Sequence, residues 1–260
     1  MGVRSVAVDE WLQIDDLRHL DLLEKEHLRL RLRGRTFMAL PGSERAGREV
    51  ARLIEDALAR HGHILRRDGE HPLDTAGRSV QEDLCLLERV DEGGSPRWVL
   101  TAGSVCFPTR WDLTSKLGCS LAEIHAPVPR YTEQLGMQVD RFFDRMLPDS
   151  LAGRLNWSIV DEMTRRLEPS DRTAPVTLPA DPGRELFLRI ERQTLRRLVD
   201  HDAVVFGIRI HVWPLGQVAA ALPAATFADM LSSIPLDVAR YKDLGGFRDG
   251  LAAWLRMRSG

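Results

Sequence analysis

The chain is 260 residues long, with 43% hydrophobic and 28% charged residues, which is typical of a globular protein with a sizeable core. Its 36 basic and 38 acidic residues nearly cancel, and no basic stripe alternates with aromatic residues, which argues against nucleic-acid binding. No apolar run approaches the roughly 20 residues needed to span a membrane. We therefore expect a soluble protein, folded as a single domain over residues 1–260, that binds neither nucleic acid nor membrane.

The N-terminus and the cysteines both predict a cytoplasmic protein. Asp9 and Glu10 stand where a secretory signal would need an apolar segment. Cys85, Cys106 and Cys119 are odd in number and lack the paired spacing of a zinc site, an iron–sulfur cluster or a redox dithiol. We expect them to be small core residues with reduced thiols.

Two scaffold helices are predicted in the first quarter of the chain. Over residues 11–33, leucines recur among dense charge, and Asp15 and Asp16 are candidate N-caps for a helix with a solvated outer face. A second helix should begin at Ser43 and end at Gly62. Its apolar stripe has helical spacing and consists of Val50, Leu53, Ile54, Ala57 and Leu58.

The middle of the chain predicts a hairpin and then another helix. Short apolar runs at 84–87 and 98–105 are separated by residues 91–96, whose acidic, glycine, serine and proline residues favour a turn. Over residues 131–147 the apolar side chains fall on one helical face, and Pro148 ends the pattern.

The second half predicts three further strands and a helical C-terminus. The strands cover 156–160, 185–192 and 204–213, and the proline-rich residues 168–182 form a loop that could cover a site. Helical patterns follow at 227–241, broken by Pro235, and at 247–258. The predicted fold class is α+β: a mainly antiparallel sheet with flanking helices.

His125 is the first candidate functional residue. It stands before Pro127 and Pro129, which restrict the backbone and push the residues before them toward extended conformations. A histidine held on so stiff a turn is a good ligand, because one ring nitrogen can bind a metal while the other donates a hydrogen bond. Spacing alone leaves open that His125 is a buried histidine with a structural role.

Two cations precede this histidine. Arg110 and Lys116 lie in a segment otherwise built of aromatic residues, small residues and turns. Such side chains can hold the carboxylates or phosphates of a ligand, and a solvated surface role is the alternative for each.

The strand at 204–213 carries a second group of candidates. Alternation places Gly207, Arg209 and His211 on one face, and a glycine within a strand often marks close approach by a ligand. On the neighbouring strand, Glu191 is placed to meet Arg209 across the pair. The alternative is a structural salt bridge on an exposed sheet face.

Common catalytic motifs are missing from the sequence. There is no glycine-rich phosphate loop after a strand, no pair of zinc-binding histidines on a helix and no nucleophile serine on a strand–turn–helix elbow. Standard hydrolase, kinase and nicotinamide-dependent functions are therefore disfavoured.

Nearly the whole chain resembles the family typified by the alpha subunit of heme-dependent oxidative N-demethylase. The residues that carry the resemblance form eight runs, at 11–15, 39–43, 80–87, 106–111, 116–118, 124–129, 156–157 and 190–198. The resemblance implies a single PAS-like heme-binding domain with helical extensions at both ends. It also implies heme b with an axial histidine, dioxygen as co-substrate, and oxidative removal of a methyl group from a small secondary amine.

The resemblance also assigns roles to the candidate residues. It makes His125 the favoured iron ligand over His211, and Arg110 and Lys116 candidate partners of the heme propionates. Gly207 becomes part of the cofactor site, while Glu191, Arg209 and His211 become candidates for orienting the amine and activating oxygen. The expected reaction hydroxylates the carbon next to nitrogen, and the carbinolamine collapses to an aldehyde and the shortened amine.

Electrons for this reaction must come from a separate reductase, because the chain has no cluster-binding cysteine set and no flavin or nicotinamide motif. The chain departs from the family pattern at Ile210, where tyrosine is usual, which leaves open a second iron ligand at His211. Two other functions are therefore considered. One is a heme-based sensor without turnover, in which His125 and His211 both bind iron, and the other is a heme-free assembly subunit.

Overall fold

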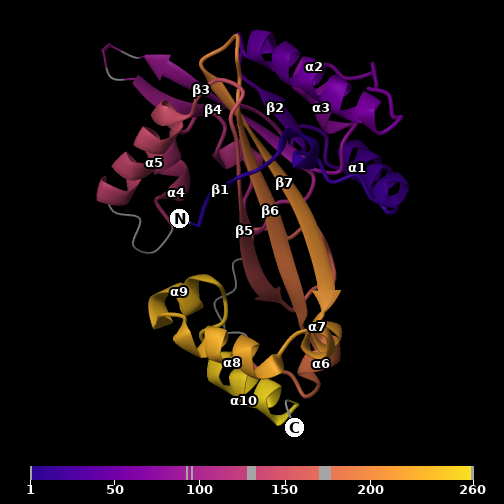
Figure 1. The fold of residues 1–260 in the computed structure, drawn as a ribbon, viewed down its shortest axis with the longest axis vertical. Helices are drawn as coiled ribbons and strands as arrows, with labels where there is room; N and C mark the ends of the chain where they lie inside the picture. Colours follow the sequence, from indigo (N-terminus) through magenta and orange to yellow (C-terminus); the bar gives the residue numbers. More distant parts are fainter. Residues whose placement is uncertain (1, 92, 95, 128–132, 170–176, 259–260) are drawn as a thin grey trace. The chain divides into compact units, whose positions relative to one another are not determined.

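A computed structural model describes residues 2–91, 93–94, 96–127, 133–169 and 177–258 (Figure 1). Within these residues the chain forms a seven-stranded antiparallel sheet with the strand order β1-β5-β6-β7-β3-β4-β2. The strands are β1 (Arg4–Ser5), β2 (Phe37–Ala39), β3 (Asp83–Asp91), β4 (Pro96–Ser104), β5 (Leu151–Val160), β6 (Phe187–Arg197) and β7 (Ala203–Pro214).

Helices accompany the sheet in three groups along the chain. The N-terminal group is α1 (Arg18–Arg31), α2 (Glu44–Arg60) and α3 (Pro72–Gly77), and the middle group is α4 (Leu121–His125) and α5 (Glu133–Arg145). The C-terminal group is α6 (Pro182–Glu185), α7 (Leu215–Ala221), α8 (Ala224–Ser233), α9 (Leu236–Tyr241) and α10 (Arg248–Met257). The predicted α+β class is confirmed. The PAS-like topology stays a prediction.

The chain divides into two compact units. Unit 1 comprises Met1–Leu155 and Arg192–Arg209, and unit 2 comprises Asn156–Glu191 and Ile210–Gly260. The division falls within β5, β6 and β7, so each of these strands contributes residues to both units. The single domain over residues 1–260 stays a prediction.

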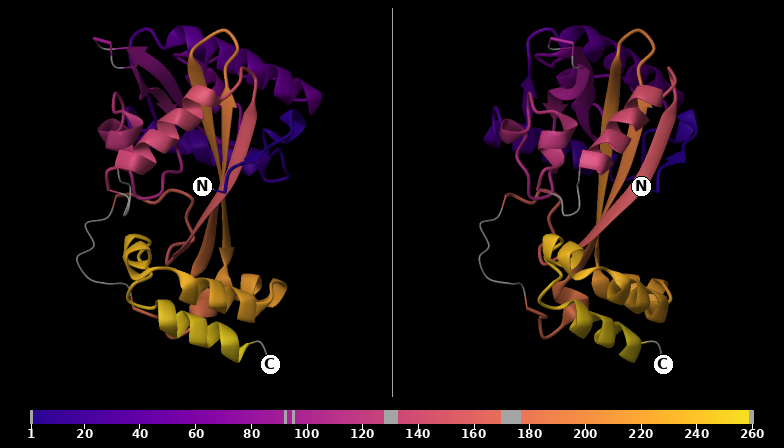
Figure 2. Two further views of the ribbon diagram at one scale, coloured as in Figure 1. Left: turned by 60° about the vertical axis from the view of Figure 1, so that its left-hand side comes forward. Right: turned by 90° about the vertical axis from the view of Figure 1, so that its left-hand side faces the viewer.

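Helices lie on both faces of the sheet in unit 1 (Figures 1 and 2), and each face has a hydrophobic core. The α2-side core joins the apolar stripe of α2 and residues of α3 to one set of strand residues, among them Leu84, Leu86, Ala102 and Val205. The α5-side core joins α4 and α5 to the alternate set, among them Cys85, Leu87, Leu100 and Val204. Because successive strand residues point to opposite faces, both faces of this sheet are buried.

Unit 2 has an apolar core of its own. It is built mainly from the C-terminal helices, with Ile159 of β5 and Leu188 of β6. Pro235 separates α8 from α9, as the sequence predicts, because proline cannot continue a helix interior. Helices α3, α4, α6 and α7 were not predicted.

The strongest sequence patterns are confirmed. Helix α2 begins after Ser43 and ends before Gly62, whose φ is 73°. All the residues of its predicted apolar stripe are buried. Strands β3 and β4 form the predicted hairpin, with Leu84 opposite Ser104 and Asp91 opposite Pro96. Helix α5 follows the predicted pattern, although Tyr131 lies outside the described residues and the side chain of Leu135 is not described.

Helix α1 differs from its predicted start. The residue at its N-cap is Leu17, so the expectation that Asp15 or Asp16 caps it is wrong. The Asp15 carboxylate instead accepts from the Leu17 amide, from Gln81 and from the guanidinium of Arg209.

The face of α1 that meets the rest of unit 1 is polar. Its buried residues are Asp21 and Lys25. Lys25 Nζ donates to the carbonyl oxygens of Val80 at 3.0 Å and Glu82 at 2.6 Å. Several leucines of this region are exposed instead: Leu17, Leu20, Leu23 and Leu30. In the described part of the chain, no helix is long and apolar enough to cross a membrane.

Candidate functional site

His125 is the last residue of α4, a short helix in unit 1. A capping box begins this helix: Ser120 Oγ accepts from the Glu123 amide, and the Glu123 carboxylate accepts from the Ser120 amide. Ala126 keeps helical torsions, φ −50° and ψ −36°, so the expectation of an extended residue before Pro127 is wrong. The capped turn outweighs the steric preference that proline imposes on its predecessor. Pro129 lies outside the described residues.

The environment of the His125 ring favours neutral imidazole. Nδ1 donates to the carbonyl oxygen of Leu121 at 2.8 Å, which assigns a proton to Nδ1 and a lone pair to Nε2 in the neutral ring. Burial lowers the pKa of His125, the Leu121 hydrogen bond opposes this effect, and the positive charges of Arg154 and Lys116 lower the pKa further. Neutral imidazole is the form that ligates metals.

Two cations lie close to this histidine. Lys116 Nζ donates to the carbonyl oxygen of Ile124 at 3.2 Å, which ties the turn after the 3-10 helix Leu113–Ser115 to α4. Arg154, on β5, donates through Nε to Gln193 Oε1 at 2.8 Å. The prediction named Lys116 but missed Arg154, because β5 is remote in sequence and nothing local marks this arginine.

Arg110 is half-buried, and its φ of 56° is in the left-handed region, which is uncommon for a residue with a side chain. The segment that precedes it is firmly held. The Asp83 carboxylate accepts from the backbone amides of Cys106 at 2.9 Å and Phe107 at 2.6 Å. Lys25 Nζ lies 3.8 Å from the same carboxylate. The turn that presents Arg110 is therefore anchored to the sheet and to α1.

Gly207 is surrounded by protein atoms. A Cβ at this position would lie 2.8 Å from Thr194 Oγ1 and 3.9 Å from Leu84 Cδ2. The close approach that the glycine permits is thus made by the Thr194 side chain of β6. The predicted role of Gly207 in a cofactor site stays a prediction.

Arg209 is buried on β7 and forms two ion pairs with the N-terminal region. Its Nη2 lies 2.9 Å from Asp15 Oδ2 and 2.8 Å from Asp21 Oδ2. Gln81 Nε2 donates to both aspartates, at 2.9 Å and 2.6 Å, and so completes the network. The sequence suggested a structural salt bridge on an exposed face as one alternative, whereas the Arg209–Asp21 pair is deeply buried and only the Asp15 partner is exposed.

The structure does not bring Arg209 and His125 to the same face of the sheet in unit 1. Strand alternation places Arg209 with Val205, whose side chain belongs to the α2-side core. Leu121 and Ile124, on the same short helix as His125, pack in the α5-side core. The sheet therefore separates the two candidate residues.

Glu191 lies in unit 2, where an amide and a phenol are near it. Asn156 Nδ2 donates to Glu191 Oε2 at 3.2 Å. Burial raises the pKa of Tyr241, and the negative charge of Glu191 raises it further. Lys242 Nζ donates to Asn156 Oδ1 at 3.1 Å and to the carbonyl oxygen of Trp157 at 2.5 Å. The carboxylate of Glu191 thus belongs to a polar cluster between β5, β6 and the end of α9.

His211 also lies in unit 2. Its ring stacks on Trp213, with a centroid distance of 5.1 Å and an interplanar angle of 9°. Among the described residues, no group of three or more His, Cys, Asp or Glu is arranged to hold a metal ion. The catalytic roles predicted for Glu191, Arg209 and His211 stay predictions.

A family model described as "Haem-dependent oxidative N-demethylase, alpha subunit-like" matches residues 58–252, which is most of the chain. The chain belongs to this family. The matched region contains every residue predicted for the functional site, and the resemblance seen in the sequence is confirmed. The family name also implies heme dependence and an assembly of more than one subunit.

The residues around His125 fit the heme that the N-demethylase alpha-subunit-like family name implies. A neutral imidazole with its Nδ1 proton engaged by a carbonyl is the usual arrangement of a metal-ligating histidine. Lys116 and Arg154 add positive charge beside it, and heme b carries two propionates that require such charge. These residues of unit 1 would thus suit a heme, with His125 as the residue that would hold its iron.

Proposed function

We propose that this chain is a heme-dependent oxidoreductase subunit that carries out oxygen-dependent oxidation, of the oxidative N-demethylation type, on a small secondary amine. The observation that carries the proposal is the state of His125: a half-buried, neutral imidazole with Nδ1 fixed by Leu121. The family match supports heme as the cofactor. A separate reductase protein supplies the electrons.

Each residue of unit 1 has a defined task in this proposal. His125 would hold the heme iron, and the Leu121 carbonyl keeps the ring oriented by accepting from Nδ1. Lys116 and Arg154 would neutralise propionate charge, and Arg110, on its anchored turn, would be a further propionate partner. When bound, heme b supplies the oxidation of a C–H bond next to nitrogen with dioxygen.

Glu191 is the proposed partner of the amine. At neutral pH a small secondary amine is an ammonium ion, which a carboxylate in a partly buried site can pair and orient. Asn156 holds one carboxylate oxygen of Glu191, which reduces the freedom of the side chain before an amine binds. His211 is the proposed residue that tunes oxygen chemistry, and its stacking on Trp213 restricts its ring.

Heme binding is tested first, by expressing the full chain with a heme precursor and recording its absorption spectrum. We expect a Soret band that is lost or strongly reduced in His125→Ala. The matched control is His27→Ala, since His27 is an exposed histidine on α1. Colourless wild-type protein, or a Soret band unchanged in His125→Ala, would overturn the proposal.

Turnover is tested next, with the heme-loaded protein and a chemical or enzymatic reductant. We expect oxygen consumption and formaldehyde release in equal amounts from methylated secondary amines. Glu191→Gln should raise KM for the amine more than it lowers kcat, because it removes the charge that pairs the ammonium. A red protein that consumes no oxygen with any methylated amine would contradict the demethylase function and favour a sensor.

A further inference from the structure

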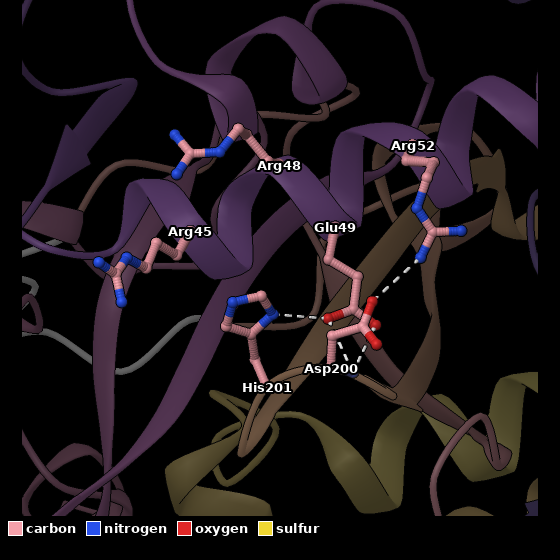
Figure 3. Close-up of a pocket in the computed structure, with 6 residues that line it drawn as sticks. All are labelled: Arg45, Arg48, Glu49, Arg52, Asp200 and His201. Atoms are coloured by element: carbon pink, nitrogen blue, oxygen red, sulfur yellow. Dashed lines mark hydrogen bonds and ion pairs between the residues drawn. The ribbon is translucent and has the colours of Figure 1, made fainter.

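A second polar site lies in unit 1 on the outer face of α2, away from the residues assigned above. It is a cavity of about 430 Å³ whose lining comes from α2 and from the turn between β6 and β7 (Figure 3). The lining residues are Arg45, Arg48, Glu49, Arg52, Asp200 and His201. The α2 part of this lining falls outside the matched residues 58–252, so the family match does not account for it.

Glu49 organises the floor of the cavity. Its side chain is only 2% exposed, and its carboxylate accepts from three donors. The donors are the Val199 amide at 2.6 Å, the Asp200 amide at 3.2 Å and Nδ1 of His201 at 2.7 Å. The negative charge of Glu49 is therefore offset within the protein, and the turn that carries His201 is fixed to α2.

His201 is oriented by this contact. Because Nδ1 donates to Glu49, the other ring nitrogen is directed away from the carboxylate, toward the side of the cavity where Arg45 lies (Figure 3). The His201 ring is thus fixed at the edge of the cavity, and a ligand bound beside Arg45 would contact it.

The arginines divide into two groups. Arg52 reaches Asp200, with Nη2 3.6 Å from Oδ2, so these two charges offset each other. Arg45 and Arg48 are exposed, and neither forms an ion pair with a carboxylate of the described residues. They stand three positions apart, which places them on adjacent parts of one helix face. The cavity lining therefore contains two guanidinium groups that form no ion pair with a carboxylate of the described residues.

We propose that this cavity is a binding site for a compact oxyanion with at least two negative charges, held by Arg45 and Arg48 beside the His201 ring. Guanidinium groups bind phosphate and carboxylate oxygens through paired hydrogen bonds, and two of them match the charge of such an anion. Their positive charge suits a phosphate group or a small polycarboxylate. This site does not depend on heme binding.

The experiment is isothermal titration calorimetry of the full chain at constant ionic strength, with inorganic phosphate in one arm and citrate in the other. We expect saturable one-site binding of at least one of them. Stronger binding of phosphate identifies a phosphate-type ligand, and stronger binding of citrate identifies a polycarboxylate. Absence of saturable binding in both arms overturns the proposal.

Variants assign the binding to this cavity. Arg45→Gln combined with Arg48→Gln should weaken binding about a hundredfold, because each of the two substitutions loses charge-assisted hydrogen bonding worth about a factor of ten. His201→Gln should weaken binding less than this double variant does. Arg60→Gln, an exposed arginine on the last turn of α2, is the matched control and should bind like the wild type.

Two further readouts make the result decisive. Thermal unfolding checks that each variant folds, which is expected because Arg45 and Arg48 are exposed. His125→Ala should bind the anion normally, which separates this site from the proposed heme site. Equal weakening by Arg60→Gln and the double variant would show non-specific charge attraction and would overturn the proposal.

Discussion

Asp21 Oδ2 lies 2.8 Å from Nη2 of Arg209, and the two side chains are only 2% and 1% exposed. The pair links α1, near the start of the chain, to β7, in its last quarter. Since a charge is costly to bury alone, each partner depends on the other, and Asp15 and Gln81 supply further hydrogen bonds. This network explains why α1 turns a polar face toward the sheet.

Arg209→Met should destabilise the protein by about 3–5 kcal/mol, because it leaves Asp21 buried without its counter-charge. Urea unfolding at pH 7 measures the change. Arg60→Met is the control and should change stability by no more than about 0.5 kcal/mol. Adding Asp21→Leu to Arg209→Met should recover part of the loss. A cost below about 1 kcal/mol for Arg209→Met would show that the pair does not hold α1.

Gly207→Ala should destabilise the protein by about 1–3 kcal/mol, because the new Cβ would meet Thr194 Oγ1. Thr194 Oγ1 is buried without a hydrogen-bond partner among the described residues, so Thr194→Ala forfeits no hydrogen bond. The double variant should therefore be more stable than Gly207→Ala alone. A double-mutant cycle in denaturant measures this coupling. If the changes in unfolding free energy caused by the two substitutions were strictly additive, the predicted clash would be contradicted.

The stability of the protein should depend on the ionisation of His125. Its pKa in the folded protein lies below the ordinary value of 6.5, so the unfolded chain binds more protons as the solution becomes acidic. The contribution of the neutral His125 ring to the free energy of unfolding is complete above pH 6.5 and is lost as the pH falls through the folded-state pKa. Wild-type protein should thus lose more stability on acidification than His125→Gln.

Unfolding free energies of the two proteins, measured at several pH values below 6.5, check this expectation. Burial also lowers the pKa of His71, but that effect is the same in both proteins and cancels in the difference. An NMR titration of the His125 ring protons gives the folded-state pKa directly. If the unfolding free energies of the two proteins depended on pH in the same way, the lowered pKa of His125 would be contradicted.

Asp112 should stabilise the protein only in its charged form. Burial alone would raise its pKa, but hydrogen bonds from Thr114 and Arg35 outweigh burial and lower the pKa to about 2. Its stabilising contribution is present above pH 3.8 and is lost as the pH falls toward 2. Asp112→Asn should cost about 1–2 kcal/mol at pH 7, since charge-assisted hydrogen bonds are lost.

Denaturant unfolding of Asp112→Asn at pH 7 and at low pH measures this effect, and its cost should disappear at the acidic end. Asp16→Asn is the control, because Asp16 is exposed and forms no ion pair in the described part of the chain. An equal cost at both pH values would mean that the carboxylate charge plays no part.

Some elements of this protein were predictable because their signals are local. The stripe of α2 repeats at helical spacing and a glycine ends it, so no distant contact is needed to recognise the helix. The hairpin of β3 and β4 has turn residues between two apolar runs. Helix α4 also had a local signal that the prediction missed, the capping box of Ser120 and Glu123.

Other features depend on contacts between distant segments. Local pattern places the leucines of α1 in a core, yet the structure buries Asp21 and Lys25, because Arg209 and the carbonyl groups near Val80 satisfy them. The partners are about 55 to 190 residues away in the chain, and a single sequence contains no local pattern that indicates such pairing. Arg154 near His125 escaped prediction for the same reason.

The sequence by itself determined the α+β class, the family and His125 as the leading candidate, because periodicity, turn residues and characteristic motifs are written in short stretches of chain. Only the tertiary structure decided which face of the sheet each candidate occupies. It placed His125 beside Lys116 and Arg154, and Arg209 on the opposite face with Asp21. Alternation along a strand defines two faces, but the packing of helices against them decides what each face meets.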